Sequence, residues 1–529
     1  MALARHDWDR RSPDEYRHGQ LRCLRRYLER QVLPFSPFYR RLFSSAGVTP
    51  ESIRGFDDLM RIPLTSKEDI APTSADPQRP REFVLQPSAE LIRERWPLAA
   101  KLPLLVSKWL RGAESVRQRL AYEYRPISVF FTTGRSALPT AFTLTRVDLE
   151  ILEEVGRRIA AVGSIDPTQD KIVSLFPYAP HLAFWQVFYV GVGACAFALN
   201  TGGGKVMGTE GILQAIQKIR PAYLVGIPGY VYHLLREGYS QGLDFSFIKS
   251  LALGGDRVTP GYRSRVKDLL CSMGAENPRV GSVLGFTEAR KCWTECPGEA
   301  SGGFHLYPDF EIVEIVDPAT GRQVPDGESG ELVYTNLVGR GSTVIRYRTG
   351  DLIIGGMTHE PCPHCGRTVP RISSQLERVS NLKSFQLSKV KGTLVNLNVF
   401  KEELENDVRV EEWQLVIKKR NDDPFDVDEL HLNLALSDRV GESQFETVRD
   451  EIVGQLFRVT EVRINQVNLL PLKQVLDLLG METHLKEKRI VDLRTDNVYA
   501  EGRDPLEVRA DGSPRGAAAG SEALGKKSR

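Results

Sequence analysis

Short apolar runs alternate with stretches of helical periodicity between about residues 128 and 290, and each run ends in glycine or proline. The runs at 171–176, 222–227 and 250–255 are the clearest. An apolar strand that stops at such a breaker and precedes an amphipathic helix is typical of βαβ units. This alternation constrains the fold more than any other feature, and it predicts a mainly parallel sheet covered by helices.

Two further stretches have strand character of a different kind. Residues 310–355 alternate polar and apolar side chains and are interrupted by a turn at 317–321, which predicts a β-rich subdomain. The runs at 414–417 and 429–434 alternate in the same way. They predict strands of a smaller, separate α+β unit.

The chain has 529 residues, which is too long for one compact core, so we expect more than one domain. We predict an α/β fold whose N-terminal domain, over 1–375, has mixed and parallel sheets with helices and includes the β-rich subdomain. A small α+β C-terminal domain follows over 376–500. The tail 501–529 is rich in glycine, alanine, serine and charge, and we expect it to be disordered.

The composition excludes several classes of partner. The 70 basic and 68 acidic residues leave a net charge of +2, so nothing draws the chain as a whole to nucleic acid or to an anionic membrane. Residues 1–20 are polar, and the apolar stretch 187–199 is shorter than the ~20 residues that span a bilayer. We expect no integral membrane segment. Seven cysteines in a chain of this kind favour a reducing, cytoplasmic location, and a homodimer stays open.

Residues 88–124 form a basic stretch with helical character. We expect an insertion that packs on the body of the protein by its apolar face. A helix that lies on a membrane surface is the alternative interpretation.

Cysteine and histidine residues have the spacing of a metal site. Cys362 and Cys365 flank a proline and a histidine and form a knuckle, and Cys296 and His305 lie upstream. These four side chains predict a structural Zn²⁺ site of the tetrahedral Cys₃His type. Cys292, His359 and His364 compete for ligand places, and reduced, unligated thiols or a redox dithiol are the alternatives.

Three other motifs could bind a nucleotide, although each has an ordinary explanation. Thr132–Ser136 follows an apolar run and could cradle phosphates, or it is a plain turn after a strand. Leu284–Glu288 ends in a carboxylate that could hold Mg²⁺, or Glu288 lies on the surface. In Arg346–Asp351 an aspartate follows a glycine turn and could accept hydrogen bonds from ribose hydroxyls, or it only shapes the turn.

Taken in order, these motifs resemble the adenylate-forming (AMP-binding) ligase superfamily and, within it, phenylacetate–CoA ligases. The likeness also includes the stretches at 36–50, 254–256, 311–318, 326–332 and 486–494, and it covers about 16–495. It implies an AMP-forming acid–CoA ligase that uses ATP and Mg²⁺ to activate a small carboxylic acid, an aryl or arylacetic acid. Coenzyme A is then the acceptor, and the C-terminal domain is mobile between the two steps.

The resemblance also assigns roles to single residues. The phosphates of ATP fall to Thr132, Thr133, Gly134 and Arg135. Thr287 would contact the phosphate of AMP, Glu288 would help to hold Mg²⁺ and Asp351 would bind the ribose. Gly285 and Arg371 complete the nucleotide site, and Lys486 would reach the α-phosphate and the acyl carboxyl oxygen. The acid pocket is expected near 178–184, 226–230 and 280–286.

Several positions depart from the pattern of the superfamily. Phe130 and Phe131 replace the usual Ser-Gly of the phosphate loop, and Leu284 replaces an aromatic residue. The hinge reads Ser-Gln-Leu-Glu-Arg at 374–378, and Leu485 replaces the glycine before the lysine. Two alternatives therefore remain beside the CoA ligase. In one, the acyl-adenylate passes to an amine or a carrier protein, and in the other the chain is a catalytically inactive nucleotide-binding relative.

Overall fold

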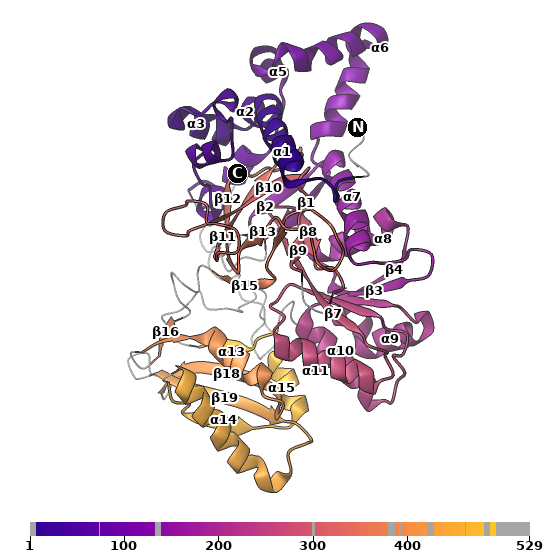
Figure 1. Cartoon of the computed structure of the whole chain (residues 1–529), viewed down its shortest axis with the longest axis vertical. Helices are drawn as coiled ribbons and strands as arrows, with labels where there is room; N and C mark the ends of the chain where they lie inside the picture. Colours follow the sequence, from indigo (N-terminus) through magenta and orange to yellow (C-terminus); the bar gives the residue numbers. More distant parts are fainter. Residues whose placement is uncertain are drawn as a thin grey trace, which may run out of the picture.

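A computed structural model describes residues 7–73, 75–132, 139–298, 302–378, 387–390, 393–420, 428–460, 462–480 and 487–493. Figure 1 shows helices of the N-terminal part at one end of an elongated molecule, the sheets in the middle and the C-terminal domain at the other end. The α/β prediction, with mixed and parallel sheets and a small α+β C-terminal domain, is confirmed.

Helices make up the N-terminal part. Helix α1 begins at a capping box in which Ser12 and Glu15 satisfy each other's backbone N–H groups. The helical elements are α1 (Pro13–Tyr27), η1 (Leu28–Val32), α2 (Leu33–Phe35), α3 (Pro37–Ala46), η2 (Pro50–Ser52), η3 (Asp57–Arg61), α4 (Lys67–Ile70), η4 (Arg79–Phe83), α5 (Ala89–Arg95) and α6 (Leu98–Tyr124).

The central sheet has the strand order β4-β3-β5-β6-β7-β8, and its strands are parallel except for β8 at the edge. The predicted βαβ units are therefore present. Its strands are β3 (Lys171–Pro177), β4 (Phe197–Gly202), β5 (Tyr223–Gly226), β6 (Ser250–Gly254), β7 (Arg279–Phe286) and β8 (Lys291–Thr294). The accompanying helices are α7 (Arg146–Val162), α8 (Leu182–Ala194), α9 (Gly204–Ile219), α10 (Pro228–Ser240) and α11 (Pro260–Ser272).

A second, antiparallel sheet corresponds to the expected β-rich subdomain. It has the order β10-β11-β12-β15, with β10 (Glu311–Val316), β11 (Gly330–Asn336), β12 (Tyr347–Ile354) and β15 (Gln375–Arg378). Because β15 pairs with β12, the first unit extends by pairing to Arg378. Smaller pairings join β1 (Ser128–Phe131) to β2 (Ala141–Leu144), and β14 (Arg371–Ile372) to β9 (Phe304–His305) and β13 (Met357–Thr358).

The C-terminal domain has its own sheet, with the order β20-β19-β18-β21, and its own apolar core. Its elements are β16 (Leu387–Val390), β17 (Thr393–Asn396), α13 (Leu397–Asn406), β18 (Val410–Lys419), β19 (Asp428–Leu436), η6 (Glu442–Gln444), α14 (Phe445–Thr460), β20 (Gln466–Leu469), α15 (Leu472–Leu479) and β21 (Ile490–Asp492). The predicted tail, 501–529, lies outside the described residues.

Polar contacts hold this domain against α10 and α11. Arg236 of α10 forms an ion pair with Glu411 at 3.1 Å, and the Thr259 hydroxyl donates to Glu405 at 2.9 Å. Lys401 forms a further ion pair with Asp256 at 3.0 Å.

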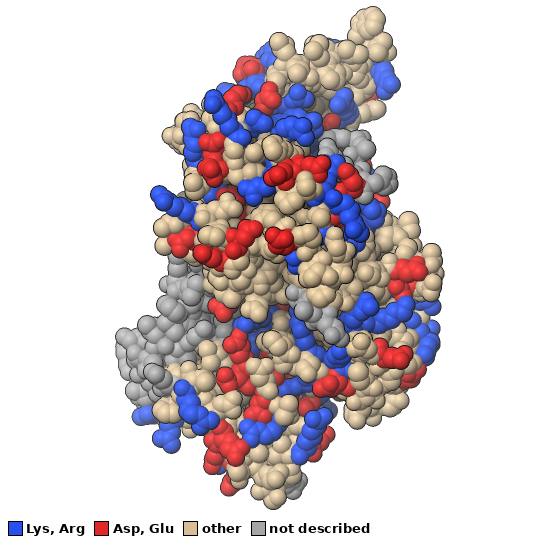
Figure 2. All heavy atoms as spheres, in the orientation of Figure 1, with Lys and Arg blue, Asp and Glu red and all other residues tan. Residues whose placement is uncertain are grey.

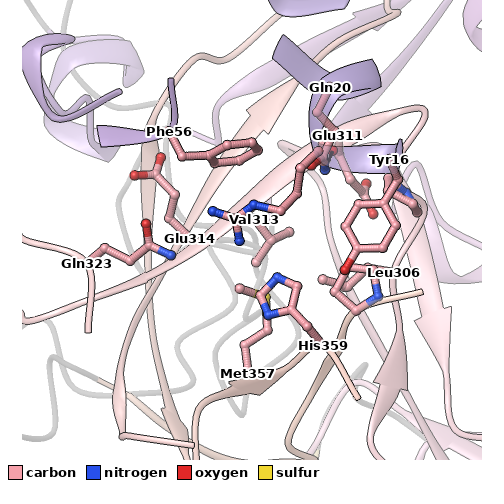
Figure 3. Close-up of a pocket in the computed structure, with 13 residues that line it drawn as sticks. Tyr16, Gln20, Phe56, Leu306, Glu311, Val313, Glu314, Gln323, Met357 and His359 are labelled. Carbon is pink, nitrogen blue, oxygen red and sulfur yellow. Dashed lines mark hydrogen bonds between the residues drawn. The ribbon is translucent and has the colours of Figure 1, made fainter. Parts of the chain in front are cut away.

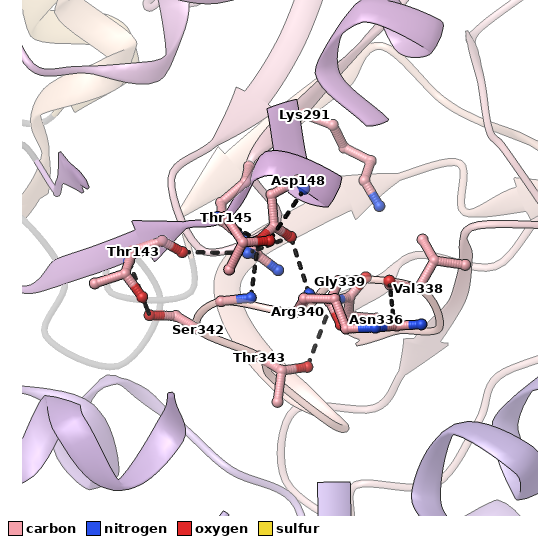
Figure 4. Close-up of polar contacts among 12 residues, drawn as sticks. Thr143, Thr145, Asp148, Lys291, Asn336, Val338, Gly339, Arg340, Ser342 and Thr343 are labelled. Atoms are coloured by element: carbon pink, nitrogen blue, oxygen red, sulfur yellow. Dashed lines mark hydrogen bonds and ion pairs between the residues drawn. The ribbon is translucent and has the colours of Figure 1, made fainter. Parts of the chain in front are cut away.

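A buried carboxylate joins α7 to the loop after β11 (Figure 4). Asp148 accepts hydrogen bonds from the backbone N–H groups of Arg340 and Gly341, at 3.1 and 2.8 Å. It also forms an ion pair with Arg290 at 2.8 Å, and both side chains are buried. This network fixes the loop that leads into the Arg346–Asp351 segment.

Among the residues that the structure describes, none of the helices combines the length and the apolar character that crossing a bilayer requires. The expected packing of 88–124 on the body is found only in part. Leu104 of α6 is buried, whereas Leu102, Leu105 and Trp109 face solvent.

Candidate functional site

Two of the predicted nucleotide motifs meet at the ends of their strands. The Thr287 hydroxyl, just after β7, donates to the carbonyl of Phe131 at the end of β1, at 3.4 Å. Thr132 and Thr140, on either side of residues 133–138, are joined by two hydrogen bonds. The Thr132 N–H donates to the Thr140 carbonyl at 3.0 Å, and the Thr140 N–H donates to the Thr132 hydroxyl at 3.1 Å. Thr133, Gly134 and Arg135 lie outside the described residues.

The third motif is joined to the second by a side-chain contact. The hydroxyl of Tyr347, the first residue of β12, donates to Glu288 at 2.8 Å. Asp351 lies farther along the same strand, and its N–H donates to the Thr349 hydroxyl at 3.1 Å. Gly350 between them has φ of 75°, a conformation that favours glycine. The structure therefore brings together the three segments around Thr132, Glu288 and Asp351.

Arg346 anchors the start of this segment in the core. Its guanidinium binds Glu314 of β10 through two hydrogen bonds, at 3.0 and 2.9 Å, and donates to the carbonyl of Ile62 at 2.8 Å. Both side chains of the pair are 2% exposed. Burial raises the pKa of Glu314, and the charge of Arg346 opposes that shift. Sequence reasoning did not find this role, because Glu314 lies on a different strand.

Gly285, at the end of β7, is needed for close packing. It pairs with Cys292 of β8, and a Cβ on Gly285 would overlap the Cys292 sulfur. Gly285 also lines a large cavity, of about 930 Å³, between the central sheet, α8 and the C-terminal domain. Its proposed contact with the nucleotide stays a prediction.

The lining of this cavity is mixed in chemistry. Its apolar part includes Phe176, Leu182, Ala183, Val187 and Val283. Its basic residues include Arg257, Lys267 and Arg279, of which Arg257 forms an ion pair with Glu402 at 2.6 Å. Residues of β7 between 280 and 285, where the acid pocket was expected, line the cavity. Tyr178, which was also expected there, is 64% exposed and is not among the lining residues.

A second, much smaller cavity lies between α1 and the β-rich subdomain (Figure 3). Tyr16, Phe56, Val313 and His359 surround it. Its volume of about 20 Å³ is close to the space that one water molecule occupies. It is too small for a nucleotide or an organic acid.

The four predicted metal ligands do come together. The ligand atoms of Cys296, His305, Cys362 and Cys365 all lie within 4.8 Å of one another. The first three residues are buried and Cys365 is partly exposed. A hydrogen bond from the Cys296 thiol holds the pKa of Cys365 well below its usual range, and the same bond raises the pKa of Cys296.

The distances in this cluster fit a metal better than a disulfide. The sulfurs of Cys296 and Cys362 are 3.6 Å apart, and the Cys365 sulfur is 3.2 Å from Nε2 of His305. A tetrahedral zinc with Zn–S bonds of about 2.3 Å separates two sulfurs by about 3.8 Å. A disulfide requires about 2.05 Å. The donor set thus suits Zn²⁺.

Arg371 lies beside this cluster. It pairs with His305 across β14 and β9, and its guanidinium donates to the carbonyls of Gly302 and Glu360. These contacts tie Arg371 to the segments that precede His305 and Cys362 in the cysteine and histidine cluster. Its proposed nucleotide contact stays a prediction.

Lys486 lies outside the described residues, but the residue that follows it is placed. A Cβ on Gly229, at the start of α10, would overlap the Glu487 carboxylate. Arg489 holds Glu487 at 2.7 Å and Glu412 at 2.8 Å. The C-terminal segment therefore reaches the 226–230 region, where the acid pocket was expected.

Comparisons with known proteins agree with this arrangement. The family model described as "AMP-binding enzyme" matches residues 139–341. A phenylacetate-coenzyme A ligase of Thermus thermophilus is 26% identical over 445 residues, which are 81% of this chain and 83% of the relative. One from Pseudomonas putida is 24% identical, over 90% of this chain and 95% of the relative.

A solved structure shares the fold. It is a 2-hydroxyisobutyryl-CoA ligase in the postadenylation state, with a TM-score of 0.70 and 22% identity, and 92% of each chain is covered. The family match over residues 139–341 supports an adenylate-forming protein of the AMP-binding class. The curated relatives support, within that class, a protein similar to phenylacetate-coenzyme A ligases.

Proposed function

We propose that the protein is an AMP-forming acid–CoA ligase. It joins a carboxylic acid to the AMP part of ATP, with release of pyrophosphate, and then transfers the acyl group to the thiol of coenzyme A, with release of AMP. We infer an aryl or arylacetic acid, because the apolar side chains that line the large cavity, such as Phe176 and Leu182, suit a carbon skeleton without charge.

One observation carries this proposal. The Tyr347–Glu288 hydrogen bond and the Thr287 contact with Phe131 unite three motifs that are distant in sequence. A phosphate loop, an acidic residue and a ribose-binding aspartate are the parts that a site for Mg-ATP needs. A relative that no longer binds nucleotide would have no reason to keep all three together, and the exchange assay below separates the enzyme from an inactive relative that binds nucleotide.

The residues have separate tasks in this proposal. Thr132 and the loop after it would hold phosphate oxygens, Thr287 would bind the α-phosphate and Asp351 the ribose hydroxyls. Glu288 would hold Mg²⁺, which supplies positive charge as two anions approach each other. Lys486 would stabilise the charge that develops between the acyl carboxylate and the α-phosphorus.

Basic side chains in the cavity lining support coenzyme A as the acceptor. Lys267 and Arg279 line the cavity, to which the C-terminal domain contributes Glu402 and Asn406. These two cations would attract the phosphates of coenzyme A.

The experiment supplies the purified chain with Mg-ATP and a panel of aromatic and aliphatic acids. Acid-dependent ATP–pyrophosphate exchange measures adenylation, and thioester formation on adding coenzyme A measures the second step. We expect both, with a preference for arylacetic acids. Exchange without thioester would favour an amine or a carrier protein as acceptor. Absence of exchange with every acid would reject the enzyme.

We further propose that Cys296, His305, Cys362 and Cys365 bind a structural Zn²⁺. Such a site needs reduced thiolates, which is consistent with the proposed cytoplasmic location. Metal analysis after gentle purification should find about one zinc per chain. The variant Cys362→Ser should lose it, whereas Cys271→Ser, at an exposed cysteine, should not. Equal zinc in both variants would contradict the site.

A further inference from the structure

Helices α5 and α6 form an arm, residues 89–124, that projects from the N-terminal end of the molecule (Figure 1). Helix α6 is sharply bent at Gly112, which has φ of 82° and ψ of 171°. The hydroxyls of Ser107 and Ser115 lie 3.0 Å apart across this bend. Eight residues of continuous helix would separate them by about 12 Å, so the chain turns back at the tip.

The first half of α6 has an apolar face that faces solvent. Six large apolar side chains on it are more than half exposed: Leu98, Leu102, Leu105, Val106, Trp109 and Leu110. Four of them recur three or four residues apart and so lie along one side of the helix. Leu104 and Val116 instead pack against the core, so the helix is held in place with this other face uncovered. Exposed patches of this kind mark interaction sites.

The charge on the first half of α6 has one sign. From Leu98 to Gly112 the chain contains Lys101, Lys108 and Arg111 and no aspartate or glutamate. The nearly balanced total of the whole chain conceals this local excess. Figure 2 shows the tip of the molecule as mostly uncharged surface with basic side chains at its margin.

We propose that this arm docks on an anionic lipid surface. Trp109 and Leu105 enter the boundary between head groups and acyl chains, and Lys108 and Arg111 contact lipid phosphates. Apolar residues with tryptophan on one side and cations beside them are the features of helices that lie in this interface. The protein would thereby be held at a membrane while its catalytic domains stay in water.

Charge favours a lipid over a second copy of the chain. In a symmetric dimer the same face meets itself, so Lys108 and Arg111 of both copies would approach each other, and the first half of α6, Leu98–Gly112, has no acidic residue to pair with them. A lipid surface that carries phosphates removes this repulsion. Each lysine or arginine near an anionic lipid surface raises the affinity of a protein for that surface about fivefold.

Vesicle flotation tests the proposal with the full chain. Phosphatidylcholine vesicles with phosphatidylglycerol should carry the protein upward, and vesicles of phosphatidylcholine alone should carry at least tenfold less. Leu105→Ser with Trp109→Ser should abolish flotation. A matched control is Phe457→Ser with Val459→Ser, since both residues are about half exposed on a helix of the C-terminal domain.

Charge reversal provides the second arm of the test. Lys108→Glu with Arg111→Glu should reduce binding to the anionic vesicles at least tenfold, because two cations become anions. Lys205→Glu with Lys218→Glu, at exposed positions of α9, should leave it unchanged. Higher salt should weaken binding of the natural chain.

Three results would overturn the proposal. They are no flotation with anionic vesicles, equal flotation of the Leu105/Trp109 variant, and a dimer that needs these two residues and binds no vesicles. The outcome is separable from the proposed enzyme function, because ATP–pyrophosphate exchange in solution should be the same for the natural chain and the arm variants.

Discussion

The buried pair of Arg346 and Glu314 offers a quantitative test of how the nucleotide segment is held. The substitution Glu314→Gln keeps the shape of the side chain and removes its charge. Arg346, 2% exposed, is then left as a buried cation without a counter-charge. Breaking such a pair costs about 3–5 kcal/mol. Because burial already raises the pKa of Glu314, relief of its desolvation offsets part of the loss, and we expect about 3 kcal/mol.

Urea unfolding, followed by fluorescence, measures this change. With an m-value of about 3 kcal/mol/M for a domain of this size, the midpoint should fall by about 1 M. The control is Glu82→Gln, which removes an exposed ion pair with Arg41 and should cost less than about 1 kcal/mol. The double variant Glu314→Leu/Arg346→Met leaves no unpaired charge and should recover much of the loss. Equal midpoints for Glu314→Gln and Glu82→Gln would refute the reasoning.

Three further predictions concern the site, the metal and pH. The variant Tyr347→Phe removes the 2.8 Å hydrogen bond to Glu288 and should lower acid-dependent exchange about tenfold with little change in the unfolding midpoint; an unchanged rate would remove Tyr347 from the site. Zinc removal by a chelator should lower the thermal midpoint, and added zinc should restore it, whereas a midpoint that ignores the chelator would speak against a structural metal. Burial alone would raise the pKa of Glu154, but hydrogen bonds from two neighbouring arginines outweigh it and lower the pKa. The contribution of Glu154 to the free energy of unfolding is therefore present above about pH 4.3 and is lost as the pH falls. The free energy of unfolding of Glu154→Gln should depend less on pH in this range than that of the natural chain. The same pH dependence in both proteins would contradict this assignment.

Much of the fold could be predicted from local sequence. The alternation of apolar runs and helices gave the parallel sheet because strand and helix periods differ and glycine or proline ends each run. The spacing of Cys362 and Cys365 predicted a metal knuckle for a similar reason, since two thiols on a tight turn are already close.

Contacts between distant strands were beyond such reasoning. Nothing local indicates that Arg346 pairs with Glu314, because that contact depends on the strand order of the β-rich sheet, in which β10 and β12 flank β11. Nothing local indicates that Tyr347 reaches Glu288 either, because that contact depends on how this sheet meets the end of β7. The arm shows a different limit. Helical periodicity identifies an apolar face, but it does not say whether the body of the protein, a lipid or water covers it.

The central claim is that this chain forms acyl-adenylates, and it depends on Lys486, which only the sequence identifies. The most direct test is acid-dependent ATP–pyrophosphate exchange in the natural chain and in Lys486→Ala, with Lys473→Ala, at an exposed position of α15 in the same domain, as the matched control. We expect exchange in the natural chain and the control, and a loss of at least about a hundredfold in Lys486→Ala. No exchange with any acid, or normal exchange in Lys486→Ala, would contradict the account.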